Sequence, residues 1–303
     1  MAEILLTQLS FHRSGFQLEL DHLVIAPGEK VALMGENGCG KSTLLSLMTG
    51  LAQPRVGSIA YDGRELAAIP FNERAKTFSL LAQFSEVSFP LTVEEVALMG
   101  RFAHLGPQGY SQEDRALSCA NLERVDMLRY RHRSYGELSG GEQRRVMLAR
   151  VLNQQTPVIF LDEPSASLDV RHTLEIFAHL ASLDATVVTA VHDINLAYDH
   201  FDRFLFFKQG KLLFDVPRAG VTPEILSEVY HVSVSVDSRA FAFRRHRPGL
   251  SAGGAAGSGG GGSVSAVGSV PQGGGRHPLQ RGFSPCPQGR QPHQTQPGVG
   301  AQP

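Results

Sequence analysis

Short apolar runs alternate along the chain with longer stretches in which apolar residues recur at helical spacing. The runs KVALMG (30–35), PVIFLDE (157–163) and ATVVTAVH (185–192) have the length and composition of buried parallel strands, and the first two are bounded by Gly or Pro. Between them, KSTLLSLMTG (41–50) and EQRRVMLARVLNQ (142–154) have the spacing of helices. This alternation predicts an α/β fold with a mostly parallel central sheet.

Two further patterns refine the picture. The segment RFLFFKQGKLLF (203–214) alternates around Gln209 and Gly210, which predicts a β-hairpin, and FPLTVEEVALMGR (89–101) predicts an amphipathic helix capped by Thr92. From about residue 248 onward the chain has very few large apolar residues, so burial cannot offset the entropy of folding. We therefore expect a folded domain over residues 1–240 and a disordered tail, rich in Gly, Pro, Ser and Gln, over residues 248–303.

Charge is distributed unevenly along the chain. The 303 residues carry a net charge of −1, with 28 basic and 29 acidic residues, and a hydrophobic fraction of 42% that is enough for a core. No acidic residue follows Asp237, whereas seven arginines do, so the chain up to Asp237 has 21 basic residues against 29 acidic ones. The folded part is acidic by about eight charges, which disfavours nucleic acid as a partner.

The cysteines and the hydropathy of the chain indicate its cellular compartment. The three cysteines, Cys39, Cys119 and Cys286, are far apart and form no CxxC pair, so neither a disulfide framework nor a cysteine metal site is indicated. No signal peptide is evident at the start, and no run of about 18 apolar residues could span a bilayer. We expect a cytosolic protein and leave open its docking on a membrane protein.

The segment GENGCGKST (35–43) has the spacing of a phosphate-binding loop, between an apolar strand and a helix. Its glycines let successive backbone N–H groups face phosphate oxygens, Lys41 adds a mobile positive charge, and the Ser42 hydroxyl can ligate Mg²⁺. The predicted nucleotide-binding residues of this loop are Gly35, Asn37, Gly38, Cys39, Gly40, Lys41, Ser42 and Thr43.

Polar residues follow three of the predicted strands. Asp162 and Glu163 end the run VIFLDE, where both side chains can reach a site at the sheet edge. Asp162 is expected to hold Mg²⁺ through water, and Glu163 to activate the attacking water as a general base. Gln83, after KTFSLLA, could orient water or bind Mg²⁺, and His192, after TVVTAV, could contact the γ-phosphate. Taken alone, Gln83 and His192 would be read as surface or capping residues.

A second anion site is predicted at ELSGGEQRR (137–145), where Ser139, Gly140 and Gly141 stand at the start of a helix. The order of phosphate loop, Gln83, LSGGE, VIFLDE, SLD (167–169) and His192 resembles the ATP-binding-cassette ATPases over about residues 3–236. The resemblance implies a P-loop NTPase core with a mostly parallel sheet, an N-terminal antiparallel β subdomain and a helical subdomain carrying LSGGE.

The same resemblance implies how the two anion sites share one ligand. In this family the LSGGE helix of one subunit closes over the ATP bound to the phosphate loop of another. Ser139, Gly140 and Gly141 would therefore bind the nucleotide of a second copy, and Asp169 would help to couple the two sites. An aromatic residue should stack on adenine; Phe11 fits best, and His12 and Phe16 are the alternatives.

Segment lengths indicate which kind of cassette this is. Lys41 and Ser139 are fewer than 100 residues apart, which leaves no room for the coiled coil of chromosome-maintenance cassettes, and there is one cassette without a fused membrane span. The segments 91–106, 192–216 and 221–234 resemble the ATPase subunits of bacterial importers for iron-siderophore complexes, haem and cobalamin. In those importers the stretch after Gln83 faces the membrane partner, so we expect a permease-binding groove formed by Phe84, Phe89, Leu91 and Phe102.

The prediction is thus an ATPase, with ATP and Mg²⁺ as cofactors, on the cytoplasmic face of the inner membrane. Its expected partners are a second copy, two permease subunits and, indirectly, an extracytoplasmic substrate-binding protein. Two alternatives stay open: a non-transport cassette with a regulatory or nucleic-acid-handling role, and a nucleotide-binding module without turnover. The expected function is that of the ATPase subunit of a bacterial importer for an iron-siderophore complex, haem or cobalamin. The substrate itself is not encoded in this chain, and molybdate or another metal species stays open.

Overall fold

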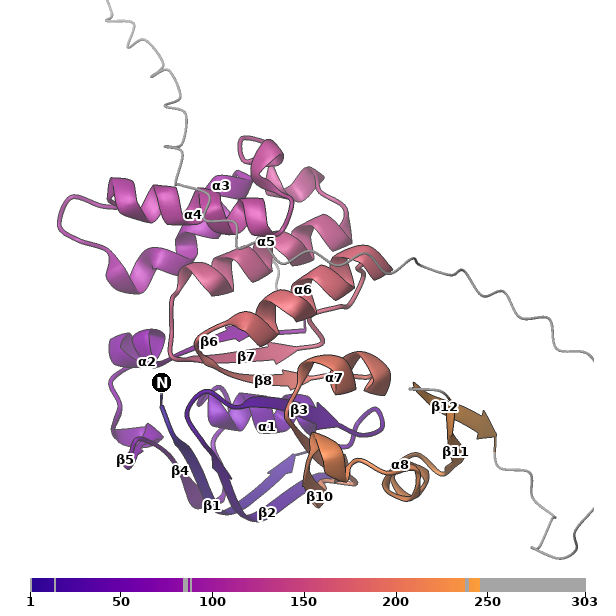
Figure 1. Ribbon diagram of the computed structural model, residues 1–303. Coiled ribbons are helices and arrows are strands. Elements are labelled where there is room, and N and C mark those ends of the chain that lie inside the picture. The colour runs from indigo at the N-terminus through magenta and orange to yellow at the C-terminus, as the bar shows by residue number, and fades with distance from the viewer. Residues whose placement is uncertain (1, 14, 84–86, 88, 238–239, 246–303) are drawn as a thin grey trace, which may run out of the picture. The chain divides into compact units, whose positions relative to one another are not determined.

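The computed structural model of the protein describes residues 2–13, 15–83, 87, 89–237 and 240–245. The predicted tail, 248–303, lies outside these residues. The last described strand ends at Arg245, five positions beyond the predicted end of the folded domain. Figure 1 shows a central sheet with helices on both faces.

The described residues form a ten-stranded sheet and a separate two-stranded one. The order in the large sheet is β5-β4-β1-β2-β10-β9-β3-β8-β7-β6, and β11 pairs with β12. The strands are β1 (Ile4–Arg13), β2 (Phe16–Ile25), β3 (Lys30–Met34), β4 (Val56–Tyr61), β5 (Arg64–Glu65), β6 (Phe78–Leu81), β7 (Val158–Asp162), β8 (Thr186–Ala190), β9 (Arg203–Lys208), β10 (Lys211–Pro217), β11 (Val232–Asp237) and β12 (Ala240–Arg245).

The large sheet has a parallel part and an antiparallel part. Strands β9, β3, β8, β7 and β6 pair in parallel, whereas β1 pairs antiparallel with both β2 and β4. The predicted hairpin, β9 and β10, turns at Gln209 and Gly210, both with positive φ, and β10 meets β2 at the single pair Lys211 and Glu19. The predicted mostly parallel core with an N-terminal antiparallel subdomain is confirmed.

Alternate residues of the central strands enter two different cores. Along β3, Ala32 and Met34 belong to the core beneath the later helices, and Val31 and Leu33 belong to the core around α1. Every residue of β3, β7 and β8 is buried. The continuous apolar runs of the sequence are therefore strands that are covered on both faces.

The helices divide between the two faces of the sheet and a separate helical group. Helices α3, α4 and α5 pack on one another and form the upper part of Figure 1. The helices are α1 (Lys41–Met48), α2 (Phe71–Thr77), α3 (Val93–Leu98), α4 (Gln112–Arg124), α5 (Gly140–Asn153), α6 (Val170–Ser182), α7 (Ile194–His200) and α8 (Pro223–Tyr230).

Capping and one buried ion pair stabilise the helical group. Thr92 caps α3 in a capping box with Glu95, which confirms the predicted cap. The Arg101 guanidinium lies 2.7 Å from Asp114 Oδ1, with only 11% and 9% of the two side chains exposed, and it also donates to the carbonyl of Asn153 at 2.8 Å. Arg101 thus joins the segment after α3 to the start of α4 and the end of α5.

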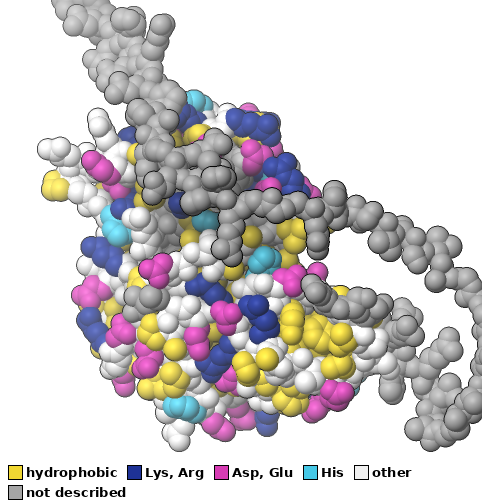
Figure 2. All heavy atoms as spheres, in the orientation of Figure 1, with side chains coloured by type: hydrophobic (Ala, Val, Ile, Leu, Met, Phe, Trp, Pro, Cys, Tyr) yellow, Lys and Arg dark blue, Asp and Glu magenta, His cyan; other side chains and the backbone are white. Residues whose placement is uncertain are grey.

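Charged side chains of both signs lie on the surface, with apolar side chains among them (Figure 2). On the face seen in Figure 2, Lys and Arg side chains are interspersed with Asp and Glu. Within the described ranges, no helix has both the length and the apolar character needed to cross a bilayer.

Candidate nucleotide site

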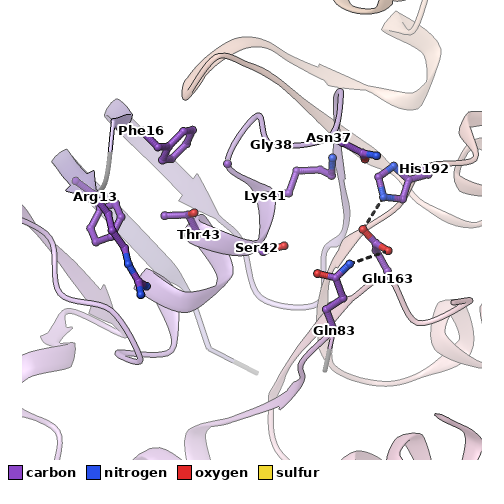
Figure 3. Close-up of a pocket in the computed structure, with 12 residues that line it drawn as sticks. Arg13, Phe16, Asn37, Gly38, Lys41, Ser42, Thr43, Gln83, Glu163 and His192 are labelled. Carbon is purple, nitrogen blue, oxygen red and sulfur yellow. Dashed lines mark hydrogen bonds and ion pairs between the residues drawn. The ribbon is translucent and has the colours of Figure 1, made fainter. Parts of the chain in front are cut away.

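A pocket of about 880 Å³ opens at the carboxyl ends of β6, β7 and β8, beside the start of α1. This volume lies within the range of small-molecule sites. Figure 3 shows its lining as sticks. The lining residues are Phe11, Arg13, Phe16, Asn37, Gly38, Gly40, Lys41, Ser42, Thr43, Gln83, Glu163 and His192. The pocket therefore brings together most of the phosphate loop and all three residues predicted to act in catalysis.

The loop between β3 and α1 is shaped by glycines in backbone conformations that other residues rarely adopt. Gly35 and Gly40 have φ of 136° and 114°, and a Cβ on Gly35 would lie 2.2 Å from the carbonyl oxygen of Phe207. Lys41 Nζ donates to the carbonyl oxygens of Gly35 at 2.7 Å and Glu36 at 3.1 Å. The loop thus curls around its own lysine, which places one positive charge at the floor of the pocket.

The remaining loop residues divide between surface and interior. Asn37 and Gly38 are exposed, while Cys39 is buried, with its Sγ 3.8 Å from Lys41 Nζ. The carbonyl of Cys39 accepts from the Gly210 N–H at 3.0 Å. Cys39 is therefore a small residue that anchors the loop to the β9–β10 turn.

Ser42 and Asp162 lie together at the head of α1. Burial raises the pKa of Asp162 above its ordinary value, and the neighbouring Ser42 hydroxyl opposes that rise. Asp162 Oδ1 is buried and has no hydrogen-bond partner among the described residues. A buried carboxylate oxygen without a partner is costly unless a cation or a donor reaches it, and this oxygen lies beside the phosphate loop.

Glu163, Gln83 and His192 come from three strand ends and meet at the rim of the pocket. Glu163 Oε1 lies 2.6 Å from His192 Nε2, and Glu163 Oε2 accepts from Gln83 Nε2 at 3.4 Å. Glu163 itself has a φ of 51°, in the left-handed region, at the point where the chain leaves β7. Figure 3 shows Gln83 and His192 on either side of the Glu163 carboxylate.

The opposite wall of the pocket comes from the β1–β2 hairpin. In its register Phe11 faces Leu18, His12 faces Gln17, and Arg13 faces Phe16. Because neighbouring residues on a strand point to opposite faces, Phe11 and Arg13 share the pocket side and His12 points away. Phe16 lies closest to the loop, since a Cβ on Gly40 would be 2.9 Å from its ring.

The LSGGE segment does not line this pocket. Ser139 caps α5 in a capping box, and its hydroxyl donates to Glu142 Oε2 at 2.7 Å. This contact holds the pKa of Glu142 below its usual value. Asp169 caps α6, where it accepts from the His172 N–H at 2.9 Å. Ser139, Gly140, Gly141 and Asp169 thus form a second cluster, and their contact with nucleotide stays a prediction.

The structure adds three residues that the sequence patterns did not single out. Arg144, on α5, is buried and donates to the carbonyls of Ala82 at 2.6 Å and Glu163 at 2.8 Å, and also to that of Asp162. The Tyr230 hydroxyl accepts from the Gly35 N–H at 3.1 Å, and Arg13 lines the pocket. Arg144 and Tyr230 contact backbone groups that are distant in sequence, so no local sequence pattern indicates their roles.

Comparison with known proteins places this site in a family. A sequence model of the ABC transporter family matches residues 18–166. Together with the relatives described next, this match shows that the chain belongs to that family and is one of its ATPases.

The relatives are ATP-binding proteins of importers. The chain is 40% identical over 226 residues to the hemin import ATP-binding protein HmuV of Pseudomonas putida, covering 72% of this chain and 88% of that protein. It is 36% identical over 236 residues to the petrobactin import ATP-binding protein FpuC of Bacillus anthracis, covering 74% and 85%. Over 220 residues it is 37% identical to the cobalamin import ATP-binding protein BtuD of Halobacterium salinarum, covering 71% and 55%.

Solved structures agree on the fold. A chain of a metal-chelate type ABC transporter in an inward-facing conformation has a TM-score of 0.66 at 23% identity, covering 80% of this chain and 96% of that chain. A dimeric bacterial ABC transporter cassette has a TM-score of 0.64 at 28% identity, covering 72% and 100%. The P-loop NTPase architecture expected from the sequence is confirmed.

Proposed function

We propose that this chain is the ATP-hydrolysing subunit of an ABC importer for hemin, a ferric siderophore or cobalamin. It works as a pair on the cytoplasmic face of the membrane, with two permease subunits and an extracytoplasmic binding protein. One observation carries the ATPase part of the proposal: the Glu163 carboxylate is held between His192 and Gln83 at the rim of a phosphate-loop pocket. A carboxylate held there can accept a proton from water aimed at a terminal phosphate.

Two opposite walls of the pocket are complementary to the adenine and to the phosphates of a nucleotide. Phe11, Phe16 and the Arg13 guanidinium offer flat surfaces for adenine, with Phe11 the preferred stacking residue. The phosphate loop with Lys41 faces them across the pocket and holds the phosphates through backbone N–H groups.

The residues beside the loop fit a magnesium ion. Asp162 offers a buried oxygen without a hydrogen-bond partner among the described residues, next to the Ser42 hydroxyl. Neither here nor elsewhere in the described part do three His, Cys, Asp or Glu side chains gather around one point. Asp162 and Ser42 would hold Mg²⁺, because one carboxylate with a hydroxyl suits an ion that prefers oxygen ligands, and the ion would supply positive charge beside the phosphates.

Hydrolysis then divides among three side chains. Glu163 takes the proton of the attacking water, and Gln83 orients that water together with Glu163. His192 is 44% exposed at its side chain, so it can turn from Glu163 Oε1 to a γ-phosphate oxygen when the site closes. Arg144 holds the backbone carbonyls of Ala82 and Glu163, so the backbone from which the Gln83 and Glu163 side chains extend is fixed.

Dimerisation completes the site. A related cassette, 27% identical with a TM-score of 0.64, is dimeric in a post-hydrolysis state with ADP and Pi bound. By analogy, Ser139, Gly140 and Gly141 of one copy close over the γ-phosphate in the pocket of the other, and Asp169 couples the two sites. Loss of the γ-phosphate removes the shared anion and lets the copies part.

The permease surface is proposed on the segment after β6. Phe89, Met99, Phe102 and Leu105 are 74%, 42%, 74% and 43% exposed, which is unusual for such large apolar side chains. Of the four residues expected to form the groove, Phe89 and Phe102 are available. Leu91 is half-buried and packs against the helical core, so it is a weaker candidate, and Phe84 lies outside the described residues.

The ATPase proposal is tested with purified Glu163→Gln protein. We expect steady-state ATP hydrolysis to fall by about 10²-fold or more, the effect typical of losing a general base, while ATP with Mg²⁺ converts monomer to dimer in light scattering. Glu175→Gln, which removes an exposed carboxylate from α6, is the matched control and should behave as wild type. Unchanged hydrolysis by Glu163→Gln would refute the assignment of the base.

The importer proposal is tested in the host cell by deleting the gene. Growth is then measured with hemin, a ferric siderophore or cobalamin as the only source of the limiting nutrient. We expect growth on one of the three to fail and to return with the wild-type gene but not with Glu163→Gln. Normal growth on all three, together with ATPase stimulation by DNA, would replace the importer with a nucleic-acid-handling ATPase.

A further inference from the structure

The start of the LSGGE helix and the turn that leads to Asp169 touch directly. A Cβ on Gly141 would lie 2.5 Å from the carbonyl oxygen of Ser167. Ser167 itself has a φ of 66°, and Asp169 two residues later caps α6. The backbone of the turn therefore lies against the first turn of α5, and only a glycine permits this approach.

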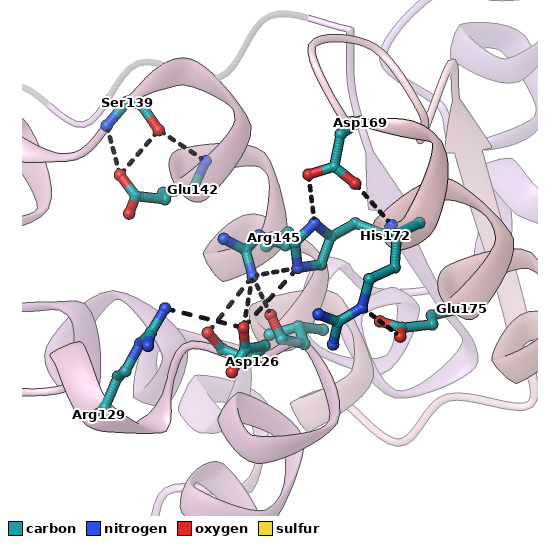
Figure 4. A network of polar contacts seen from close by, with 10 residues as sticks. Asp126, Arg129, Ser139, Glu142, Arg145, Asp169, His172 and Glu175 are labelled. Atoms are coloured by element: carbon teal, nitrogen blue, oxygen red, sulfur yellow. Dashed lines mark hydrogen bonds and ion pairs between the residues drawn. The ribbon is translucent and has the colours of Figure 1, made fainter.

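A second link joins the same two elements one helical turn after Gly141. There Arg145 of α5 meets His172 of α6. His172 Nδ1 lies 2.7 Å from Asp169 Oδ2, and His172 Nε2 lies 3.1 Å from a terminal nitrogen of Arg145. A guanidinium can only donate, so Nε2 accepts and the ring proton sits on Nδ1, which donates to Asp169. His172 thus uses both ring nitrogens, as the dashed contacts in Figure 4 show.

The link continues from Arg145 into the helical group. Arg145 also donates to the carbonyl of Val125 at 3.0 Å and lies 3.7 Å from Asp126 Oδ2, just beyond the end of α4. The side chains of Arg145 and His172 are only 9% and 16% exposed, whereas those of Asp126 and Asp169 are 49% and 63% exposed, so the network is buried at its centre and open to solvent at both ends. Asp169, His172, Arg145 and Asp126 form an unbroken chain from the α6 cap to the helical group.

We propose that His172 is a positioning residue for the ATP-bound dimer. It fixes the turn with Asp169 to the LSGGE helix, so that Ser139 and Asp169 approach a second copy as one rigid unit. This inference rests on the proposed function, because it needs the nucleotide-bound dimer. His172 does not line the nucleotide pocket and is not expected to touch ATP in its own chain.

The two nitrogens of His172 can be tested separately. His172→Asn keeps a donor near the Nδ1 position for Asp169 and loses the contact with Arg145. His172→Gln keeps an acceptor near the Nε2 position for Arg145 and loses the contact with Asp169. His179→Asn is the matched control, because His179 lies two turns along the same helix and its Nε2 has no hydrogen-bond partner among the described residues.

All variants are made in the Glu163→Gln protein and compared by ATP-dependent dimerisation in light scattering, by the affinity of the monomer for a fluorescent ATP analogue, and by thermal melting. If His172 joins the two elements, both His172→Asn and His172→Gln weaken dimerisation by about tenfold, within the range for residues in one hydrogen-bonded network. Monomer affinity stays that of the parent, and His179→Asn dimerises normally.

Each other outcome refutes a different statement. If either His172→Asn or His172→Gln dimerises as well as the parent, one contact suffices and the bridging role is wrong. If both lose monomer ATP binding together with thermal stability, His172 merely holds the fold and the positioning role is also wrong. If the Glu163→Gln parent fails to dimerise with ATP, the dimer of the proposed function fails first, and the inference falls with it.

Discussion

Replacing Tyr230 with Phe should loosen the phosphate loop, although Tyr230 follows it by 195 residues. The Tyr230 hydroxyl accepts the Gly35 N–H at 3.1 Å, and Gly35 is buried. Burial raises the pKa of Tyr230 to about 12, so the variant loses a neutral hydroxyl and no charge at pH 7. A buried N–H left without an acceptor costs about 1–3 kcal/mol, so we expect the free energy of unfolding to fall by about 1.5 kcal/mol.

Part of that cost should also appear in nucleotide binding, because the loop must be ordered to hold phosphate. An affinity loss of up to about tenfold corresponds to about 1.4 kcal/mol. Urea unfolding and titration with a fluorescent ATP analogue measure the two effects. Tyr198→Phe is the control: its ring packs on Phe241 at 5.4 Å, but no hydrogen bond of its hydroxyl is found in the described part of the chain. Equal stability and equal affinity of the two variants would refute the role of the Tyr230 hydroxyl.

Two further changes test the helical group and the LSGGE turn. Asp114→Asn should lower the free energy of unfolding at pH 7 by about 3 kcal/mol, because it leaves the nearly buried Arg101 without its partner. Burial favours the neutral form of Asp114, but the Arg101 contact and the Ser111 hydrogen bonds keep its pKa below the usual value. The stability that the ion pair contributes is therefore present above about pH 4 and is lost as pH falls through the lower pKa of the folded state. Urea midpoints of wild type and variant should therefore converge toward pH 2, and a constant gap would contradict the ion pair. Gly141→Ala should lower the melting temperature, because the new Cβ would lie 2.5 Å from the Ser167 carbonyl oxygen. Gly140→Ala is the control and should not lower it, because no atom lies within 4 Å of a Cβ there. Equal melting temperatures of the two variants would refute the close contact.

The parallel core was predictable because its information is local. Each of β3 and β7 is an apolar run whose residues are all buried, and the predicted segments match the observed strands to within about a residue at each end. The place of β10 between β9 and β2 was not predictable, since a single pair, Lys211 and Glu19, joins β10 to β2. Strand neighbours that are distant in sequence are selected by packing of the whole sheet, and no local pattern encodes them.

The site divides in the same way. The phosphate loop, Asp162 and Glu163 follow from short motifs, because their geometry is set by the residues next to them. Arg144 and Tyr230 act on backbone groups that are distant in sequence, so their roles depend on tertiary packing. The residue that stacks on adenine is only partly predictable from the sequence. The alternation along β1 excludes His12, but both Phe11 and Phe16 line the pocket.

Helix α5 is where the two halves of the proposed cycle meet. Ser139 caps its first turn, and Arg144 and Arg145 follow within about 9 Å along the axis at 1.5 Å per residue. Arg144 holds the carbonyls of Ala82 and Glu163 in the chain's own pocket, while Arg145 reaches His172 and the helical group. Because the same helix carries all three residues, a rotation of α5 that brought Ser139 onto a partner's phosphate, as proposed, would also shift the backbone carbonyls of Ala82 and Glu163. In the proposed dimer, a chain's own pocket would thus respond to the closure of its α5 on a partner's nucleotide through the backbone carbonyls that Arg144 holds.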